Sequence, residues 1–322
     1  MSKKKVVVIG GGTGNFTVLS GLKNYDLDLT AIVSMADDGG STGILRDELG
    51  VLPPGDVRQC LVALSNSSLL MRSLMNYRYE TGSLGGHSFG NLFLSALEKV
   101  TGSFEKAVEE MGRILYIQGK VIPVTTHEVR LKMILKDRTI LEGEKEIYLS
   151  QKIDQGYSSV FLEPYATANI NALFEIRNAD LIILGPGGLH TSIVPNLLVK
   201  GVGEALKKSK AKKVFIINLM NRKGQTTNFK VSNYLKEVVK YIGEDVFDHL
   251  LVNSDVPDDE QMKSYHDEGD LVENDITSKR VIMAPMIGKI LTPSKKDLLK
   301  RSLIRHDSNK LATELMKIVS HI

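Results

Sequence analysis

Short runs of aliphatic residues recur along the chain, and segments with helical spacing follow most of them. The first run covers 5–9, and Phe16, Leu19 and Leu22 then recur at helical spacing, which predicts a helix over 15–23. A second apolar run, over 29–33, predicts the next strand. A strand, a helix and a strand within about 30 residues form a βαβ unit, whose crossover is almost always right-handed.

The same alternation returns in the second half of the chain. Glycine and polar residues separate the predicted elements, as expected where strands connect to helices. Alternating strands and helices predict an α/β fold with a doubly wound, mostly parallel sheet and helices on both faces. We interpret residues 1–322 as a single domain. The predicted strands cover 181–184, 213–218, 249–253 and 281–284, and the predicted helices cover 44–49, 57–64, 89–100, 104–115, 168–177, 193–200, 231–242 and 310–318.

The middle of the chain has a different pattern. Leu131, Met133 and Leu135 alternate with basic residues, which predicts a half-exposed strand. Residues 139–141 and 145–149 are its expected partner strands. Because this segment is too short to bury much surface alone, we interpret about 118–165 as a β-rich insertion within the α/β domain.

Composition excludes some classes of protein. The formal charge is +3, from 41 basic and 38 acidic residues, which is too balanced to indicate nucleic-acid binding. The single cysteine, Cys60, cannot form an internal disulfide, so a reducing compartment is expected. Only four apolar residues follow the basic start, fewer than a signal peptide or a membrane span requires. We therefore expect a cytoplasmic protein without a membrane span.

The glycine-rich segment 10–14 lies between the first predicted strand and helix. Glycine allows close approach of a ligand to the backbone, and the helix start offers unpaired N–H groups, so this segment predicts a phosphate site. It departs from the dinucleotide fingerprint Gly-x-Gly-x-x-Gly and lacks the lysine of a P-loop. The alternative is a turn without a ligand. The candidate residues are Gly10, Gly11, Gly12, Thr13, Gly14 and Asn15.

Two acidic residues follow the second predicted strand. Asp37 or Asp38 would bond a ribose hydroxyl, and adjacent carboxylates would also suit Mg²⁺. A solvated turn is the alternative. The glycine and hydroxyl residues that follow, Gly39, Gly40 and Ser41, join the candidate site.

Two further segments open predicted helices in the first half. Asp56 is a candidate helix cap, and Arg58 lies in the first turn, where the helix dipole disfavours a cation and an anionic partner would offset it. A surface Arg–Asp pair explains Arg58 equally well. His87 and Asn91 lie in a second glycine-rich segment, where His87 would contact phosphate or act as an acid or base, although a lone loop histidine is usually a bystander.

A third glycine-rich loop follows the strand at 181–184, and Asn218 follows the next strand. Hydroxyl side chains at such a position suit both helix capping and phosphate binding. Several such loops at one sheet edge predict one shared ligand pocket. The candidates in the third loop are Gly185, Gly187, Gly188, Thr191 and Ser192.

Taken in order, these motifs resemble the bacterial gluconeogenesis-factor proteins of the CofD-like (2-phospho-L-lactate transferase) superfamily over nearly the whole chain. The resemblance implies a Rossmann-like core, binding of a UDP-sugar such as UDP-N-acetylglucosamine, and a role in cell shape during growth on gluconeogenic carbon sources. The motifs are Gly-Gly-Gly-Thr-Gly at 10–14, Ala-Asp-Asp-Gly-Gly-Ser-Thr-Gly at 36–43, Pro-Pro-Gly-Asp-Val-Arg at 53–58, Phe-Gly-Asn-Leu at 89–92, Gly-Pro-Gly-Gly-Leu-His-Thr-Ser at 185–192, Asn-Leu-Met at 218–220 and Arg-His-Asp at 305–307.

The transferase branch of the superfamily couples a guanylylated phospholactate to a deazaflavin precursor, with Mg²⁺ held by acidic residues. Asp38 and Asp56 match those acidic positions best, and Asp37 is a close rival. This chain departs from the transferases after Asp38, so we expect a nucleotide-sugar-binding regulatory protein rather than an enzyme. The alternatives are a Mg²⁺-dependent phosphoryl or nucleotidyl transferase and an NAD-binding protein. Arg305 is a weaker candidate for contacting a diphosphate.

The expected partner is a small nucleotide ligand, and no nucleic-acid partner is expected. A second copy of the chain and regulators of cell-envelope synthesis are kept as candidate partners. Mg²⁺ is the candidate metal, and a UDP-sugar or NAD is the candidate ligand.

Overall fold

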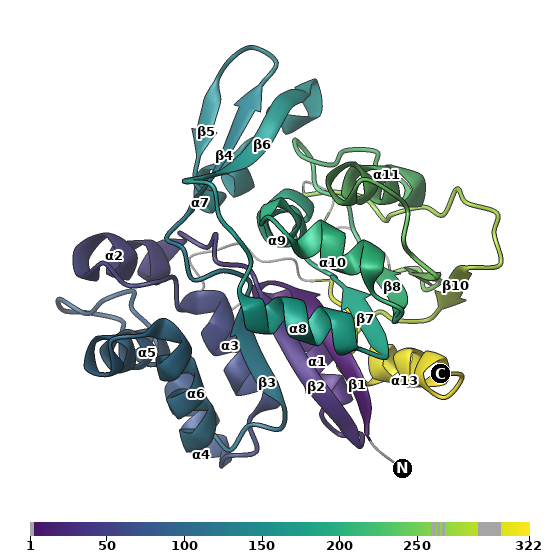
Figure 1. The fold of residues 1–322 in the computed structure, drawn as a ribbon. Coiled ribbons are helices and arrows are strands. Elements are labelled where there is room, and N and C mark those ends of the chain that lie inside the picture. Colours follow the sequence, from purple (N-terminus) through teal and green to yellow (C-terminus); the bar gives the residue numbers. More distant parts are fainter. Residues whose placement is uncertain (1–2, 259–261, 263–264, 266–267, 289–303) are drawn as a thin grey trace.

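A seven-stranded sheet forms the centre of the computed structural model, which describes residues 3–258, 262, 265, 268–288 and 304–322 (Figure 1). The strand order is β10-β9-β8-β7-β1-β2-β3, and every neighbouring pair is parallel. The predicted doubly wound α/β fold is therefore confirmed. The strands are β1 (Lys4–Gly10), β2 (Leu27–Val33), β3 (Lys120–Pro123), β7 (Leu181–Leu184), β8 (Lys212–Ile216), β9 (His249–Asn253) and β10 (Val281–Ala284).

The strand order reverses direction between β1 and β7. From β1 the chain adds β2 and β3 on one side, whereas β8, β9 and β10 follow β7 on the other side. Because the crossovers between parallel strands are right-handed, the helices of the two halves cover opposite faces of the sheet. Figure 1 shows α8 and α10 in front of the sheet and α1 behind it. The reversal leaves a crevice at the carboxyl ends of β1 and β7, where such sheets bind their ligands.

The helices agree with the predicted pattern, except that α4 and α10 were not predicted and α7, described below, was expected to be a strand. Most of them pack an apolar face against the sheet or against a neighbouring helix. The first half contains α1 (Gly12–Leu22), α2 (Gly40–Leu49), α3 (Gly55–Leu64), α4 (Leu69–Asn76), α5 (Phe89–Thr101) and α6 (Phe104–Ile114). The second half contains α8 (Ile170–Asn178), α9 (Val194–Leu198), α10 (Val202–Lys208), α11 (Val231–Ile242) and α13 (Ser308–Val319).

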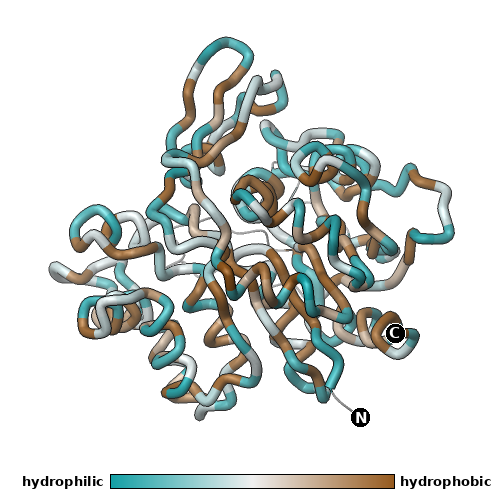
Figure 2. Tube along the Cα trace, in the orientation of Figure 1, coloured by the Kyte–Doolittle hydropathy of each residue, from teal (hydrophilic) through white to brown (hydrophobic). Residues whose placement is uncertain are grey.

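Burial of the central strands explains their continuous apolar sequence. Val6, Val7, Val8 and Ile9 of β1 are each at most 1% exposed, because helices cover both faces of the sheet. Figure 2 shows hydrophobic residues concentrated in the central strands, with hydrophilic residues along the outer surfaces. No helix in the described part of the chain is both long and apolar enough to cross a membrane.

The first and last helices of the chain pack closely against each other. A Cβ added at Gly21 of α1 would lie 2.1 Å from the backbone oxygen of Ser308 and 2.8 Å from the Cβ of Ala312 in α13. The two helix axes can therefore approach closely only with glycine at position 21. Helix α13 thus covers one side of helix α1.

A small antiparallel sheet, in the order β5-β4-β6, projects from the main body (Figure 1). Its strands are β4 (Arg130–Leu135), β5 (Ile140–Glu142) and β6 (Tyr157–Glu163), and the short turn η1 (Ile153–Gln155) precedes β6. Leu131, Met133 and Leu135 of β4 are buried, as their alternation predicts. Strand β3 lies within the range expected for the insertion, but it forms the edge of the main sheet.

One element of the insertion differs from its prediction. Residues 145–149, expected to be a strand, form part of helix α7 (Glu144–Leu149). Gly143 has a φ of +94°, a conformation that favours glycine and turns the chain sharply after β5. The backbone N–H of Lys145 then donates a 2.8 Å hydrogen bond to a carboxylate oxygen of Asp38, which satisfies one free N–H at the helix start.

Candidate functional site

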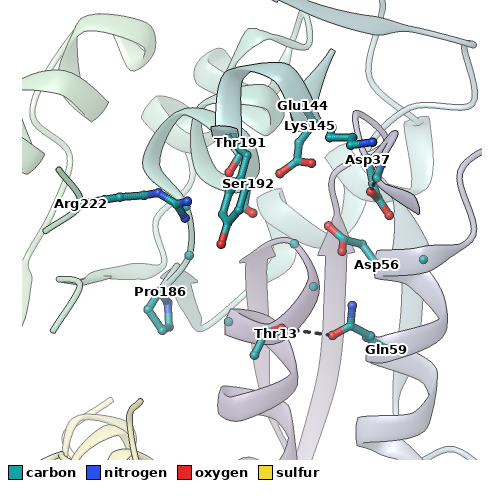
Figure 3. Close-up of a pocket in the computed structure, with 18 of the residues that line it drawn as sticks. Thr13, Asp37, Asp56, Gln59, Glu144, Lys145, Pro186, Thr191, Ser192 and Arg222 are labelled. Atoms are coloured by element: carbon teal, nitrogen blue, oxygen red, sulfur yellow. Dashed lines mark hydrogen bonds between the residues drawn. The ribbon is translucent and has the colours of Figure 1, made fainter. Parts of the chain in front are cut away.

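A pocket of about 530 Å³ lies at the switch point of the main sheet. Loops that follow β1, β2, β7 and β8 meet there, and helix α7 of the insertion contributes a further wall. Figure 3 shows side chains from all these elements turned toward a common space. The predicted meeting of the glycine-rich loops at one sheet edge is therefore observed.

The first and third glycine-rich loops contact each other directly. A Cβ added at Gly14 would lie 1.8 Å from the carbonyl oxygen of Pro186, so only glycine fits this approach. The side chain of Asn218 fixes the third loop, because its Nδ2 donates a 2.9 Å hydrogen bond to the carbonyl oxygen of Gly187. The two loops thus form one continuous floor of the pocket.

Asn196, which the sequence patterns did not single out, connects the same two loops. It is fully buried in α9, and its Nδ2 donates hydrogen bonds to the carbonyl oxygens of Gly10 at 3.0 Å and Ser192 at 2.7 Å. A buried amide that donates to two loops holds their relative position. Its place within a short apolar helix gave no motif that could have revealed it.

A carboxylate covers part of the first glycine-rich loop. Cβ atoms added at Gly11 and Gly12 would lie 2.4 and 2.5 Å from the carboxylate oxygens of Asp56, at the start of α3. Gln59, one turn later, accepts a 3.4 Å hydrogen bond from the hydroxyl of Thr13. The loop therefore lines the pocket with an acidic helix start directly against its glycines.

The adjacent residues Asp37 and Asp38 have different environments. Asp37 lies on the pocket, accepts a 2.9 Å hydrogen bond from the N–H of Gly39, and has a pKa raised mainly by burial. Asp38 points toward α7, where it accepts the hydrogen bond of Lys145. The carboxylates that the pocket brings together thus include Asp37 and Asp56, whereas Asp38 has a role in holding the insertion.

Glu144 adds a third carboxyl group that sequence reasoning missed. It lies at the start of α7, and Figure 3 shows it turned toward the same part of the pocket as Asp37 and Asp56. Burial, followed by the nearby charges of Asp37, Asp56 and Asp38, raises the pKa of Glu144 well above its usual value. Its segment, Glu-Gly-Glu-Lys-Glu, is typical of an exposed turn, so the sequence contained no sign of this role.

A hydrogen-bonded network lines the pocket on the side of α3 and α5. The Nε of Arg58 donates a 2.8 Å bond to Asn91, whose Nδ2 donates a 3.3 Å bond to the hydroxyl of Ser41. Ser41 also lies 3.1 Å from Nδ1 of His87. Arg58 in addition donates a 2.6 Å bond to Asn76. Arg58 is therefore hydrogen-bonded to other residues of the protein on the wall of the pocket.

Basic side chains lie on other walls of the pocket. Lys145 and Tyr148 of α7 and Arg222, in the loop after β8, line it, and the Arg222 guanidinium lies 3.6 Å from the centre of the Tyr148 ring. Arg305, predicted as a weaker candidate, also lies on the pocket beside His306. Burial lowers the pKa of His306 to about 4, so this imidazole is neutral at pH 7.

Most predicted site residues lie on the pocket, and five do not. Gly10 and Gly185 lie at the ends of β1 and β7, Asn15 is fully buried beneath the first loop, and His87 lies behind Ser41. Asp38 is engaged by α7, as described above. Those on the pocket are Gly11, Gly12, Thr13, Gly14, Asp37, Gly39, Gly40, Ser41, Asp56, Arg58, Asn91, Gly187, Gly188, Thr191, Ser192, Asn218 and Arg305.

The fit of the pocket to Mg²⁺ depends on its carboxylates. Among the residues that the structure describes, no group of three His, Cys, Asp or Glu side chains is arranged to hold a metal ion. Mg²⁺ commonly uses one or two carboxylates together with phosphates of the ligand. Asp37 and Asp56 fit that requirement, whereas Asp38 does not, because it faces α7.

The fold and the pocket define a Rossmann-like α/β protein with a mixed-charge pocket at the switch point of its sheet. The chain belongs to the 2-phospho-L-lactate transferase CofD family, whose model matches residues 6–289.

Similar proteins cover the chain almost completely. The gluconeogenesis factor of Bacillus subtilis (strain 168) is 40% identical over 320 residues, covering 98% of this chain and 98% of that protein. The gluconeogenesis factor of Halalkalibacterium halodurans is 39% identical, covering 98% and 97%. A crystal structure of a UPF0052 family member from Bacillus halodurans has a TM-score of 0.88 and 37% identity, covering 98% and 99%. The resemblance to gluconeogenesis factors is therefore confirmed.

Proposed function

We propose that this chain is a cytoplasmic regulatory protein that binds a nucleotide-sugar, such as UDP-N-acetylglucosamine, in the switch-point pocket. The observation that supports this proposal most is the meeting of four strand-end loops around one space of about 530 Å³. Such a volume suits a small-molecule ligand. The names of the relatives further support a gluconeogenesis factor, and we propose a role in cell shape on gluconeogenic carbon sources.

The mixed charge of the pocket agrees with a ligand that has both hydroxyl and phosphate groups. Carboxylates such as Asp37 and Glu144 accept hydrogen bonds from sugar hydroxyls, and Lys145 and Arg222 favour phosphate. The protein's own groups would bind and orient the ligand. Binding of this kind requires no turnover, which agrees with a regulatory role.

Calorimetric titration with UDP-N-acetylglucosamine tests the proposal. We expect saturable heat and a rise in the unfolding temperature, because a ligand that binds only the folded state stabilises it. The absence of both heat and thermal shift at millimolar ligand would reject the proposed function. Displacement of the UDP-sugar by NAD at comparable concentration would instead favour the NAD-binding alternative.

A second candidate is a Mg²⁺-dependent transferase, which family membership and the two pocket carboxylates Asp37 and Asp56 favour. A bound Mg²⁺ would neutralise part of the negative charge of the phosphate groups. Transfer assays with a guanylylated phospholactate and a deazaflavin precursor test this candidate. Metal-dependent product that disappears in Asp56→Asn would support it, and no product from the unaltered protein would reject it.

A further inference from the structure

Arg222 differs from the framework arginine of the pocket in its interactions. Its guanidinium lies 3.6 Å from the Tyr148 ring centre, and no carboxylate of the described residues lies within ion-pair distance of it. Arg58, by contrast, donates hydrogen bonds to Asn91 and Asn76. A guanidinium stacked on a ring keeps its edge donors free for an anion, and phosphate is the group that this planar fork matches best.

The segment after Arg222 is firmly attached to the insertion. Nε2 of Gln225 donates hydrogen bonds to the carbonyl oxygens of Ile147 at 3.2 Å and Tyr148 at 2.5 Å. The N–H of Asp154 also donates a 3.1 Å bond to the carbonyl oxygen of Gly224. These bonds join the backbone on both sides of the stacked Tyr148–Arg222 pair before any ligand arrives, which reduces the entropy lost on binding.

The first glycine-rich loop is a less favourable place for an unaccompanied anion. The carboxylate of Asp56 lies against Gly11 and Gly12, and the carboxyl groups of Asp37 and Glu144 face the same part of the pocket. Like charges at such distances repel a phosphate. Ser192 of the third loop borders this region, since a Cβ added at Gly11 would lie 3.4 Å from its Oγ, and its hydroxyl forms no hydrogen bond with the described residues. An anion at this hydroxyl therefore needs a cation beside it, and Arg222 supplies one.

We propose that Arg222, together with the hydroxyl of Ser192, binds the anionic diphosphate of the ligand, and that Tyr148 positions Arg222. In Figure 3 the Arg222 side chain points toward the part of the pocket where Thr191 and Ser192 lie. The inference rests on the proposed function and adds an orientation, with phosphates at the Arg222 side and the hydroxylated sugar toward Asp37 and Glu144.

Calorimetry with UDP-N-acetylglucosamine and the Arg222→Gln variant tests the anion site. We expect about 10- to 100-fold weaker binding, because hydrogen bonds to charged groups are strong relative to neutral ones. Arg222→Lys keeps the charge but loses the planar fork. Its affinity is expected to lie between those of the unaltered protein and Arg222→Gln. Arg78→Gln is the matched control, since Arg78 lines the same pocket and donates to the carbonyl oxygen of Gly86. Unchanged affinity in Arg222→Gln, or an equal loss in Arg78→Gln, would overturn the proposal.

The positioning role of Tyr148 needs a separate readout. Tyr148→Phe keeps the ring and is expected to lose less affinity than Tyr148→Leu, which is expected to bind several-fold more weakly than the unaltered protein. When Arg222 is already glutamine, Tyr148→Leu should have no further effect, since the group that it positions is gone. An equal loss in both backgrounds would reject the positioning role.

The two proposals fail in different ways. If the unaltered protein does not bind UDP-N-acetylglucosamine, the proposed function fails, and the anion site is then tested with inorganic pyrophosphate. Pyrophosphate binding that Arg222→Gln abolishes would support the anion site alone, and no pyrophosphate binding by the unaltered protein would reject it. Thermal unfolding of each variant checks that a loss of binding does not arise from a loss of folding.

Discussion

The first and third glycine-rich loops have similar sequences but different surroundings. The first loop, 10–14, is enclosed by Asp56 above Gly11 and Gly12 and by Pro186 beside Gly14. The third loop, 185–192, presents Gly187, Gly188 and Ser192 to the pocket and is fixed from behind by Asn218. Glycine in the first loop is therefore required for packing between protein segments even though the loop lines the pocket, whereas the third loop also offers the hydroxyl of Ser192 to a ligand.

This difference shows that glycine at the end of a strand has more than one physical cause. Close approach of a phosphate and close approach of another loop both require the absence of a Cβ. The sequence alone cannot separate the two, because both produce the same motif. Substitutions that affect one loop more than the other can separate them.

Of the substitutions considered, Gly14→Val should cause the largest loss of stability. Its Cβ would lie 1.8 Å from the carbonyl oxygen of Pro186, so the two loops must separate. We expect a loss of about 3–5 kcal/mol in the free energy of unfolding, measured by urea denaturation, as for severe overpacking.

Gly50→Ala is the control for Gly14→Val. Gly50 also requires glycine, with a φ of +58°, but a Cβ there would meet nothing within 4 Å. The free energy of unfolding of Gly50→Ala should fall by about 1 kcal/mol, because only backbone strain is added. Equal losses at the two positions would show that the contact between the loops is unimportant.

Replacing Asn196 by alanine should have an intermediate effect. The change removes the side-chain donor to the carbonyl oxygen of Ser192 and one of two donors to that of Gly10. We expect a loss of about 2 kcal/mol in urea denaturation. Asn178→Ala is a matched control, because Asn178 is exposed and its Nδ2 donates a 2.8 Å bond to Phe174, also four residues earlier. A loss below about 0.5 kcal/mol is expected for the control. Similar losses would contradict a linking role for Asn196.

Replacing Glu144 by glutamine should have the smallest effect, and its direction depends on pH. Burial and nearby carboxylates raise the pKa of Glu144 in the folded state, so the folded protein binds this proton more tightly than the unfolded chain does. The unaltered protein therefore loses stability as the pH rises through that raised pKa. We expect Glu144→Gln to be the more stable protein at pH 8, with the difference shrinking as the pH falls toward 4.

Glu204→Gln is the control for Glu144→Gln. Glu204 is exposed, and its hydrogen bond with Lys207 lowers its pKa, so its replacement should give no gain in stability at pH 8. Unfolding temperatures at pH 5 and pH 8 measure both variants. A Glu144→Gln protein that is less stable at pH 8 than at pH 5, relative to the unaltered chain, would contradict the assignment.

The sequence predicted the main sheet well because its strands are buried on both faces. Continuous apolar runs such as 6–9 and 181–184 arise directly from that burial. Residues 145–149 were interpreted as a strand because five residues are too few to distinguish a period of two from a period of 3.6. The turn at Gly143 and the capping bond from Asp38 decide that segment, and both are tertiary features.

The sequence predicted which loops form the candidate site, but only some of the side chains that line it. Asp37 and Asp38 are adjacent and chemically identical, so their different directions follow from where α7 docks. Glu144 and Tyr148 reach the pocket from a distant segment without a motif of their own, and Arg222 follows the 218–220 motif without being part of it. Asn196 is inconspicuous for the same reason. Contacts between distant segments cannot be read from local patterns.

The packing of α13 against α1 also has a consequence for synthesis on the ribosome. Strand β1 is made first, yet one of its two neighbours, β7, and the helix that covers α1 are made much later. The face of α1 that packs against α13 therefore stays uncovered until α13 has been synthesised. Premature termination before Ser308 would leave the α13-facing side of α1 uncovered and would make the released fragment a target for chaperones and proteases.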